Sequence, residues 1–123
     1  MTYHPRLLAF AAANGALAVA LGAFAAHGAE PSAKALLTTG AQYQMVHAAL
    51  ACLCATGAAG LKGARIAGWL AASGGLIFSL ALALIALAGM KFMGAVAPIG
   101  GSLMILGWIM LILAAFRSDR IGS

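Results

Sequence analysis

Residues 66–90 read IAGWLAASGGLIFSLALALIALAGM, a stretch without any Asp, Glu, Lys or Arg. An α-helix needs only about 20 apolar residues to cross the ~30 Å hydrocarbon core of a bilayer. Inside lipid every backbone N–H and C=O must find its partner within the protein, which favours a helix. The stretch also lacks the alternating polarity of a membrane β-strand. It therefore predicts a transmembrane helix over about 67–89.

Three more uncharged stretches lie on either side of this one, at 7–29, 35–61 and 92–116. Each is also longer than the ~20 residues that one crossing requires. We therefore expect an all-α membrane protein, a four-transmembrane-helix bundle that forms a single integral membrane domain over residues 1–123. Its spans are predicted at about 7–26, 38–60, 67–89 and 95–116.

The composition indicates the same surroundings. Of 123 residues, 64% are hydrophobic and 7% are charged, whereas soluble domains have about 25% charged residues. A surface with so few charges cannot be solvated by water alone. We therefore expect the lipid bilayer to be the partner of most of the protein surface. The net charge of +5 comes from basic residues at the ends of apolar runs, without a basic stripe. No nucleic-acid partner is expected from that pattern.

Basic residues near the span ends predict the orientation, because cytoplasmic loops carry an excess of Lys and Arg. With four spans, one side of the membrane receives Arg6, Lys62, Arg65, Arg117 and Arg120. The other side receives Lys34 and Lys91. This imbalance predicts N and C termini that are both cytoplasmic. Rings near the predicted interfaces, at Tyr3, Phe92 and Phe116, fit the same placement.

A cleaved signal peptide is the alternative for the first span. Arg6, the apolar run and Ala23-Phe24-Ala25 resemble a signal peptide with cleavage after residue 25. Cleavage would leave three spans and an external N terminus. The run is longer than the usual ~7–15 residues of a signal-peptide core, which favours retention as the first span.

Small residues recur at helical spacing and predict close helix packing within the molecule, or secondarily an oligomer face. These stripes are Ala11, Gly15 and Val19; Ala18, Gly22 and Ala26; Ala64, Gly68 and Ala72; and Gly75, Ser79 and Ala83.

Glu30-Pro31-Ser32 is typical of a helix start before the second span. In the last span, Pro98, Gly100 and Gly101 predict a helix kink or a loosened turn.

A candidate functional polar cluster centres on the second span. Tyr43 and His47 are four residues apart and share a helix face, and Gln44 flanks it. His27, at the outer end of the first span, completes the candidate set. No Asp, Glu, Lys or Arg lies within a predicted span, which argues against an ion-coupled pump.

Three roles are open for His47: an interhelical hydrogen bond, a proton relay or ligand-pocket residue, and a haem or metal ligand. Bis-histidine haem needs a second imidazole at matching depth, which the other spans do not supply near the midplane. The sequence has no nucleophile–base pair, phosphate loop or zinc spacing. We therefore expect no enzyme activity, catalytic residue, cofactor or metal site.

Cys52 and Cys54 point to different helix faces and are expected to be buried thiols.

Three blocks of sequence resemble an uncharacterised membrane family, domain of unknown function 423, to which the transmembrane protein 256 group is similar. The blocks are Gly22-Ala23-Phe24-Ala25-Ala26-His27-Gly28, then Tyr43-Gln44-Met45-Val46-His47-Ala48, then Pro98-Ile99-Gly100-Gly101 with Gly107-Trp108. Ala25 departs from the glycine expected there. The resemblance implies a multi-pass protein of the bacterial plasma (inner) membrane without a known activity. It marks His27, Gly28, Tyr43, Gln44 and His47 as motif positions.

The leading hypothesis is a non-enzymatic accessory or assembly protein, within a homo-oligomer or a larger membrane complex. The alternative is a carrier or pore for a small, mostly neutral solute, formed by an oligomer around the Tyr43–Gln44–His47 stripe and the loosened turn at Pro98. A redox enzyme is the third hypothesis.

Overall fold

Four long α-helices make up the protein. The computed structural model describes the backbone of residues 3–122 and the side chains of residues 3–117, so the side chain of Arg120 lies outside it. The helices are α1 (Pro5–His27), α2 (Pro31–Ala55), α3 (Ala64–Ala88) and α4 (Ala97–Gly122), with a short 3₁₀ helix, η1 (Lys91–Ala95), before α4. Residues 3–122 contain no strand. The predicted all-α class is confirmed.

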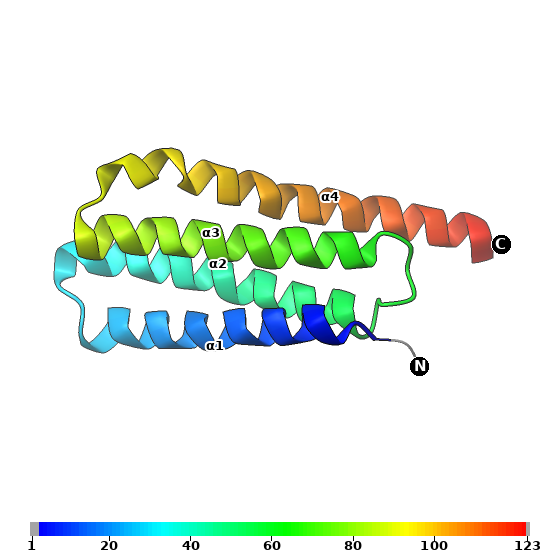
Figure 1. Ribbon diagram of the computed structural model, residues 1–123, viewed down its shortest axis with the longest axis horizontal. Helices are drawn as coiled ribbons and strands as arrows, with labels where there is room; N and C mark the ends of the chain where they lie inside the picture. The colour runs from blue at the N-terminus through cyan, green and yellow to red at the C-terminus, as the bar shows by residue number, and fades with distance from the viewer. Residues whose placement is uncertain (1–2, 123) are drawn as a thin grey trace.

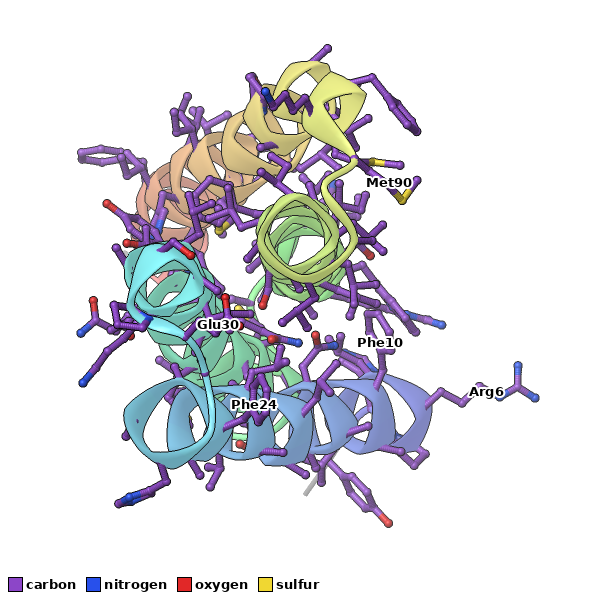
Figure 2. The ribbon with its side chains drawn as sticks, turned by 90° about the vertical axis from the view of Figure 1, so that its left-hand side faces the viewer. Arg6, Phe10, Phe24, Glu30 and Met90 are labelled. Atoms are coloured by element: carbon purple, nitrogen blue, oxygen red, sulfur yellow. The ribbon has the colours of Figure 1, made fainter. Side chains whose placement is uncertain are left out.

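Consecutive helices run antiparallel, so the chain crosses the length of the molecule four times (Figure 1). Both termini and the 56–63 loop lie at one end, and the α1–α2 turn and η1 lie at the other. Seen along the long axis, α1 and α4 lie on opposite sides of the α2–α3 pair (Figure 2). Among the described residues, α4 makes its extended contact with α3 alone.

The helix ends follow local backbone chemistry. The predicted helix start at Glu30-Pro31-Ser32 is confirmed, because α2 begins at Pro31 with Glu30 as its N-cap. α2 ends at Ala55 rather than at residue 60, because the backbone of Thr56 leaves the helical conformation. The Thr56 hydroxyl donates to the Cys52 carbonyl oxygen at 2.7 Å, which gives this carbonyl a partner at the helix end. α3 ends at Ala88, where Gly89 adopts a positive φ of 66° that favours glycine.

The irregular turn near the last helix lies upstream of its predicted position. Pro98 lies in the first turn of α4, where the missing N–H needs no partner. Gly100 and Gly101 are already within the helix, so the departure from α-helical structure falls at residues 89–96 instead. The kink predicted at Pro98, Gly100 and Gly101 is therefore corrected to the segment that includes η1.

Three described segments are long and apolar enough to cross a membrane. They are Pro5–His27, Ala64–Ala88 and Lys91–Arg117, with mean hydropathies of 2.0, 2.3 and 2.2. Helix α2 is less apolar than these three segments and is not among them. Its length of 25 residues suffices, but its polar side chains lower its hydropathy. These residues are Thr38, Thr39, Gln42, Tyr43, Gln44 and His47.

Small residues on α3 hold the helices close together. All six residues of its two predicted stripes are buried, which confirms packing within the molecule for this helix; they are Ala64, Gly68, Ala72, Gly75, Ser79 and Ala83. On α1, by contrast, Val19 and Ala26 are exposed. Both cysteines are free thiols; Cys54 is buried in the core as predicted, whereas Cys52 is only half-buried, so the prediction of burial is wrong for Cys52.

Gly74 on α3 and Gly100 on α4 bring two backbones into contact. A Cβ on Gly100 would lie 2.6 Å from the Phe78 nitrogen and 2.7 Å from the Gly74 oxygen. A Cβ on Gly74 would lie 2.7 Å from the Gly100 oxygen. No side chain fits at either position, so the two glycines set the separation of α3 and α4.

Candidate functional site

Helix α2 directs its polar side chains to two different sides. Consecutive residues of an α-helix point about 100° apart, so Gln44 cannot share the face of Tyr43. Gln44 is fully buried, whereas Tyr43 is 50% exposed. The four predicted residues therefore do not form one cluster. The structure places Gln44 in one set of contacts and the Tyr43–His47 pair in another.

The first set joins α2 to α1 through Gln44 and Asn14. The Asn14 amide nitrogen donates to the Phe10 carbonyl oxygen at 3.1 Å, which fixes the orientation of this side chain. Asn14 Oδ1 then accepts from Gln44 Nε2 at 2.9 Å. Gln44 Oε1 has no hydrogen-bond partner among the described residues. The pair is a buried interhelical contact in which one acceptor stays unused.

The second set joins α2 to α4 through His47 and Trp108. The Trp108 indole nitrogen lies 3.0 Å from His47 Nε2, and His47 Nδ1 lies 2.7 Å from the Tyr43 carbonyl oxygen. An indole N–H can only donate and a carbonyl can only accept. His47 Nε2 is therefore the acceptor and Nδ1 carries the proton. This neutral tautomer satisfies both contacts.

Aromatic rings surround the imidazole. The Trp108 ring meets it edge to face, with centroids 5.9 Å apart and an interplanar angle of 79°. Tyr43 makes an edge contact with Phe78 of α3 at 5.2 Å. These contacts hold His47 at 6% exposure between three helices. The geometry matches the interhelical hydrogen bond among the three roles that the sequence left open.

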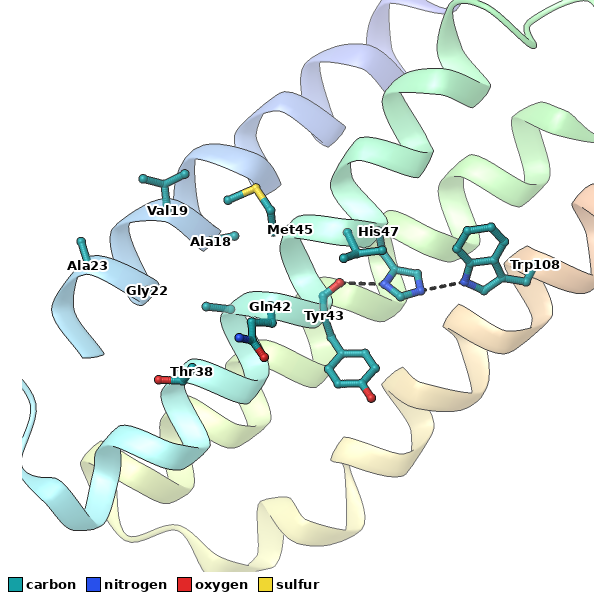
Figure 3. A pocket seen from close by; sticks show the side chains of 12 residues that line it. Ala18, Val19, Gly22, Ala23, Thr38, Gln42, Tyr43, Met45, His47 and Trp108 are labelled. Carbon is teal, nitrogen blue, oxygen red and sulfur yellow. Dashed lines mark hydrogen bonds between the residues drawn. The ribbon is translucent and has the colours of Figure 1, made fainter. Parts of the chain in front are cut away.

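An open groove lies over the outer face of α2, bordered by α1 on one side and by Trp108 of α4 on the other (Figure 3). Its volume is about 940 Å³, within the range of small-molecule pockets, roughly 300–1,000 Å³. Most of its lining is apolar, and Trp108 and His47, which are hydrogen-bonded to each other, line it on the α4 side. We call this feature the α2 groove. Its lining includes Val19, Gly22, Thr38, Gln42, Tyr43 and Val46.

The contacts of His47 bear on metal or haem binding. Both ring nitrogens already take part in hydrogen bonds, so coordination would require one of them to break. Within residues 3–117, no three His, Cys, Asp or Glu side chains gather where they could hold a metal ion. His27 lies exposed at the end of α1 and belongs to neither polar set. The arrangement can therefore connect neighbouring helices and border a groove.

The sequence alone did not predict the hydrogen-bond partners of His47 and Gln44, nor the face of α2 that lines the groove. Trp108 was recognised within a family block, but nothing in the sequence aligned it with His47, 61 residues away. Asn14 could not be matched to Gln44 without the register of α1 on α2. Thr38 and Gln42 do carry a local signal, because residues four apart share a helix face. That spacing, continued to Val46, traces the floor of the α2 groove.

Comparisons with known proteins identify the class as a small multi-helix membrane protein. The UPF0382 membrane protein YwdK of Bacillus subtilis (strain 168) is 36% identical over 113 residues, which cover 86% of this chain and 92% of YwdK. The UPF0382 membrane protein SAB0533 of Staphylococcus aureus (strain bovine RF122 / ET3-1) is 38% identical, over 86% of this chain and 91% of its own length. A Staphylococcus saprophyticus relative, SSP2132, is 39% identical, over 86% and 92% respectively.

Residues 21–101 match the family described as a protein of unknown function, DUF423. This chain belongs to the DUF423 family, as its sequence blocks predicted. No solved structure matches the chain.

Proposed function

We propose that the protein is a four-span protein of the bacterial plasma membrane, with one integral domain and both termini in the cytoplasm. Helix α2, the span in question, is about 37 Å long, more than the ~30 Å that a crossing requires. It packs on both α1 and α3. Its polar residues Gln44 and His47 bond to neighbouring helices instead of facing lipid. Its lower hydropathy is therefore compatible with a span that lies between others.

The ends of the molecule support this orientation. The start of α1 meets the end of α2 through the His4 N–H, which donates to the Ala55 oxygen at 2.9 Å. Arg117 reaches the 56–63 loop, because its guanidinium lies 3.9 Å from the place that a Cβ on Gly63 would take. The start of α1, the 56–63 loop with the start of α3, and the last turns of α4 share one end of the molecule, and they carry Arg6, Lys62, Arg65 and Arg117. The start of α2 and η1, which carry Lys34 and Lys91, lie at the other end. The excess of basic residues favours a cytoplasmic location for the first end.

Within that membrane we assign the protein a non-enzymatic accessory or assembly role, supported by the outward face of α1. Opposite its buried residues, α1 exposes alanines at helical spacing: Ala9, Ala13, Ala16 and Ala20. The exposed face of α4 carries bulky aliphatic residues instead, Ile105, Ile109, Ile112 and Leu113 among them. Small residues let another helix backbone approach closely, whereas bulky ones suit lipid. The alanine face of α1 is therefore the proposed contact with another transmembrane helix.

A carrier or pore receives less support from the same geometry. A transport path would be expected to join the polar residues of α2 into one continuous route. Gln44 and His47 are three residues apart on the buried side of α2, but Gln44 bonds to Asn14 of α1 and His47 bonds to Trp108 of α4. The accessory role remains our proposal because it needs only the surface that α1 exposes.

Purification of a tagged protein in mild detergent tests the accessory role. We expect the wild-type protein to migrate as a stable assembly, either of copies of this chain or with a stoichiometric partner. Ala16→Leu and Ala20→Leu place bulk on the alanine face and should release the monomer. Ala115→Leu, the same change on an exposed position of α4, is the matched control and should leave the assembly intact. A wild-type protein recovered only as a monomer would contradict the proposal.

A further inference from the structure

We propose that the α2 groove binds one phospholipid of the leaflet on the Lys34 side, with its acyl chain along the groove and its head group at Thr38 and Gln42. The inference goes beyond the accessory role, which concerns the alanine face of α1. It shares with that role only the placement of the helices in the membrane.

The length of the groove corresponds to one leaflet. Its floor runs along α2 from Thr38 to His47, nine residues or about 13.5 Å. One leaflet of a ~30 Å hydrocarbon core is about 15 Å deep. A transmembrane helix of a partner would have to run through both leaflets, whereas the α2 residues that line this groove extend no further than His47. The depth therefore fits a lipid chain better than a helix.

The lining changes from polar to apolar along the same direction. Thr38 and Gln42 lie at the end nearest the start of α2, and Figure 3 shows both side chains on the groove side of the helix. Val46 of α2 and Val19 of α1 lie deeper and are 54% and 59% exposed. An amphiphile with hydrogen-bonding groups at the membrane surface and hydrocarbon below them matches this order.

The charge next to the groove selects the head group. Lys34 is exposed and lies four residues before Thr38, so it stands one turn nearer the membrane surface on the same face of α2. An ammonium at this level can pair with a lipid phosphate, while Thr38 and Gln42 can bond to the glycerol esters. The lining residues themselves carry no charge. The site thus combines one cation at the surface with an uncharged groove below it.

Fluorescence of Trp108 tests this site, since Trp108 lines the groove. Trp69 is first replaced by Phe, so that Trp108 is the remaining tryptophan. The protein is reconstituted in phosphatidylcholine vesicles that contain a small fraction of phosphatidylglycerol brominated near the chain end. We expect quenching that saturates at a low fraction of brominated lipid. Phospholipid should also copurify in about equimolar amount, as measured by native mass spectrometry.

Variants separate a specific site from the surrounding bilayer. Val19→Phe and Val46→Phe fill the groove from exposed positions and should abolish both the saturable quenching and the copurified lipid. Ile112→Phe, at a position of α4 that is 55% exposed and outside the groove, should change neither. Quenching that rises in proportion to brominated lipid, and equally in all variants, would overturn the proposal.

The head group is tested by Lys34→Gln, which should weaken quenching by brominated phosphatidylglycerol relative to a brominated neutral diacylglycerol. Saturable quenching by the neutral amphiphile alone would overturn the assignment of a phospholipid. The Ala16→Leu assembly experiment does not involve the groove. Failure of the lipid site can therefore be distinguished from failure of the accessory role.

Discussion

Trp108 of α4 donates its indole N–H to Nε2 of His47 on α2, at a distance of 3.0 Å. Because α4 packs extensively only on α3 within the described chain, this bond is a specific connection of α4 to α2. It also fixes the imidazole from one side while the Tyr43 carbonyl fixes it from the other. The buried His47 therefore connects two helices and also lines the α2 groove.

Substitution of His47 should reveal which of these roles matters. His47→Leu removes the acceptor of Trp108 and should lower the free energy of unfolding by about 0.6 kcal/mol, the average for such bonds in membrane proteins. His47→Gln keeps a donor and an acceptor and should retain nearly all thermal stability in detergent. Thermal unfolding and cellular complementation are measured side by side. A stable Gln variant that fails to complement would contradict a purely structural role.

The Asn14–Gln44 pair predicts an unequal effect of its two single substitutions. Asn14→Leu leaves both ends of the buried Gln44 amide unpaired. Gln44→Leu also removes the unused Oε1 acceptor, so it should destabilise less. A double-mutant cycle in detergent should give a coupling of about 0.6 kcal/mol, and at most about 1.7 kcal/mol. Equal single effects without coupling would argue against the hydrogen bond.

Two neighbouring glycines of α4 should respond oppositely to alanine. Gly100→Ala forces a Cβ against the Phe78 nitrogen and should lower the free energy of unfolding by about 1–3 kcal/mol. Gly101→Ala meets nothing within 4 Å and should be neutral or stabilising, because alanine favours a helix by up to about 1 kcal/mol. Melting temperatures of the two variants provide the comparison. A tolerated Gly100→Ala would show that α4 can shift away from α3.

The proposed topology predicts the labelling of a cysteine at the η1 end. In a background with Cys52→Ala and Cys54→Ala, Lys91→Cys should react with a membrane-impermeant maleimide in intact cells. Fluorescent tags at either terminus should report the cytoplasm. A C-terminal tag outside the cell combined with a cytoplasmic N-terminal tag would rule out four spans.

The intact mass of the purified protein should include α1. This helix carries Asn14, the partner of Gln44, and Leu7, which is 1% exposed, so its removal would open the core. An N terminus at Ala26 would instead establish cleavage of a signal peptide. The N-terminal residue is read directly by mass spectrometry.

Features that depend on the residue pattern within one helix could be predicted from the sequence. Contacts that depend on how far one helix is shifted along another could not. The uncharged run at 66–90 was enough to place α3, and Glu30-Pro31 placed the start of α2. Tyr43 and His47 were correctly put on one face, because their spacing is a property of a single helix. The partner of His47 could not be predicted, since the meeting with Trp108 depends on how far α4 slides along α3. Likewise, Pro98 suits either a kink or a first turn, and the residues before it decide between them.

The attachment of α4 along one side of α3 has a consequence for biogenesis. The buried residues of the cluster around Leu7 and Cys54 all belong to α1, α2 and α3, and the Asn14–Gln44 bond joins α1 to α2, whereas α4, among its described side chains, adds only the partly buried Met110 and Leu111. A nascent chain can therefore bring these helices together while residues 97–122 are still leaving the ribosome. Docking of α4 across Gly74 and Gly100 is then the final step, and the Trp108–His47 bond is among the last contacts to form. Environment-sensitive fluorescence from Trp108 would consequently report when insertion is complete.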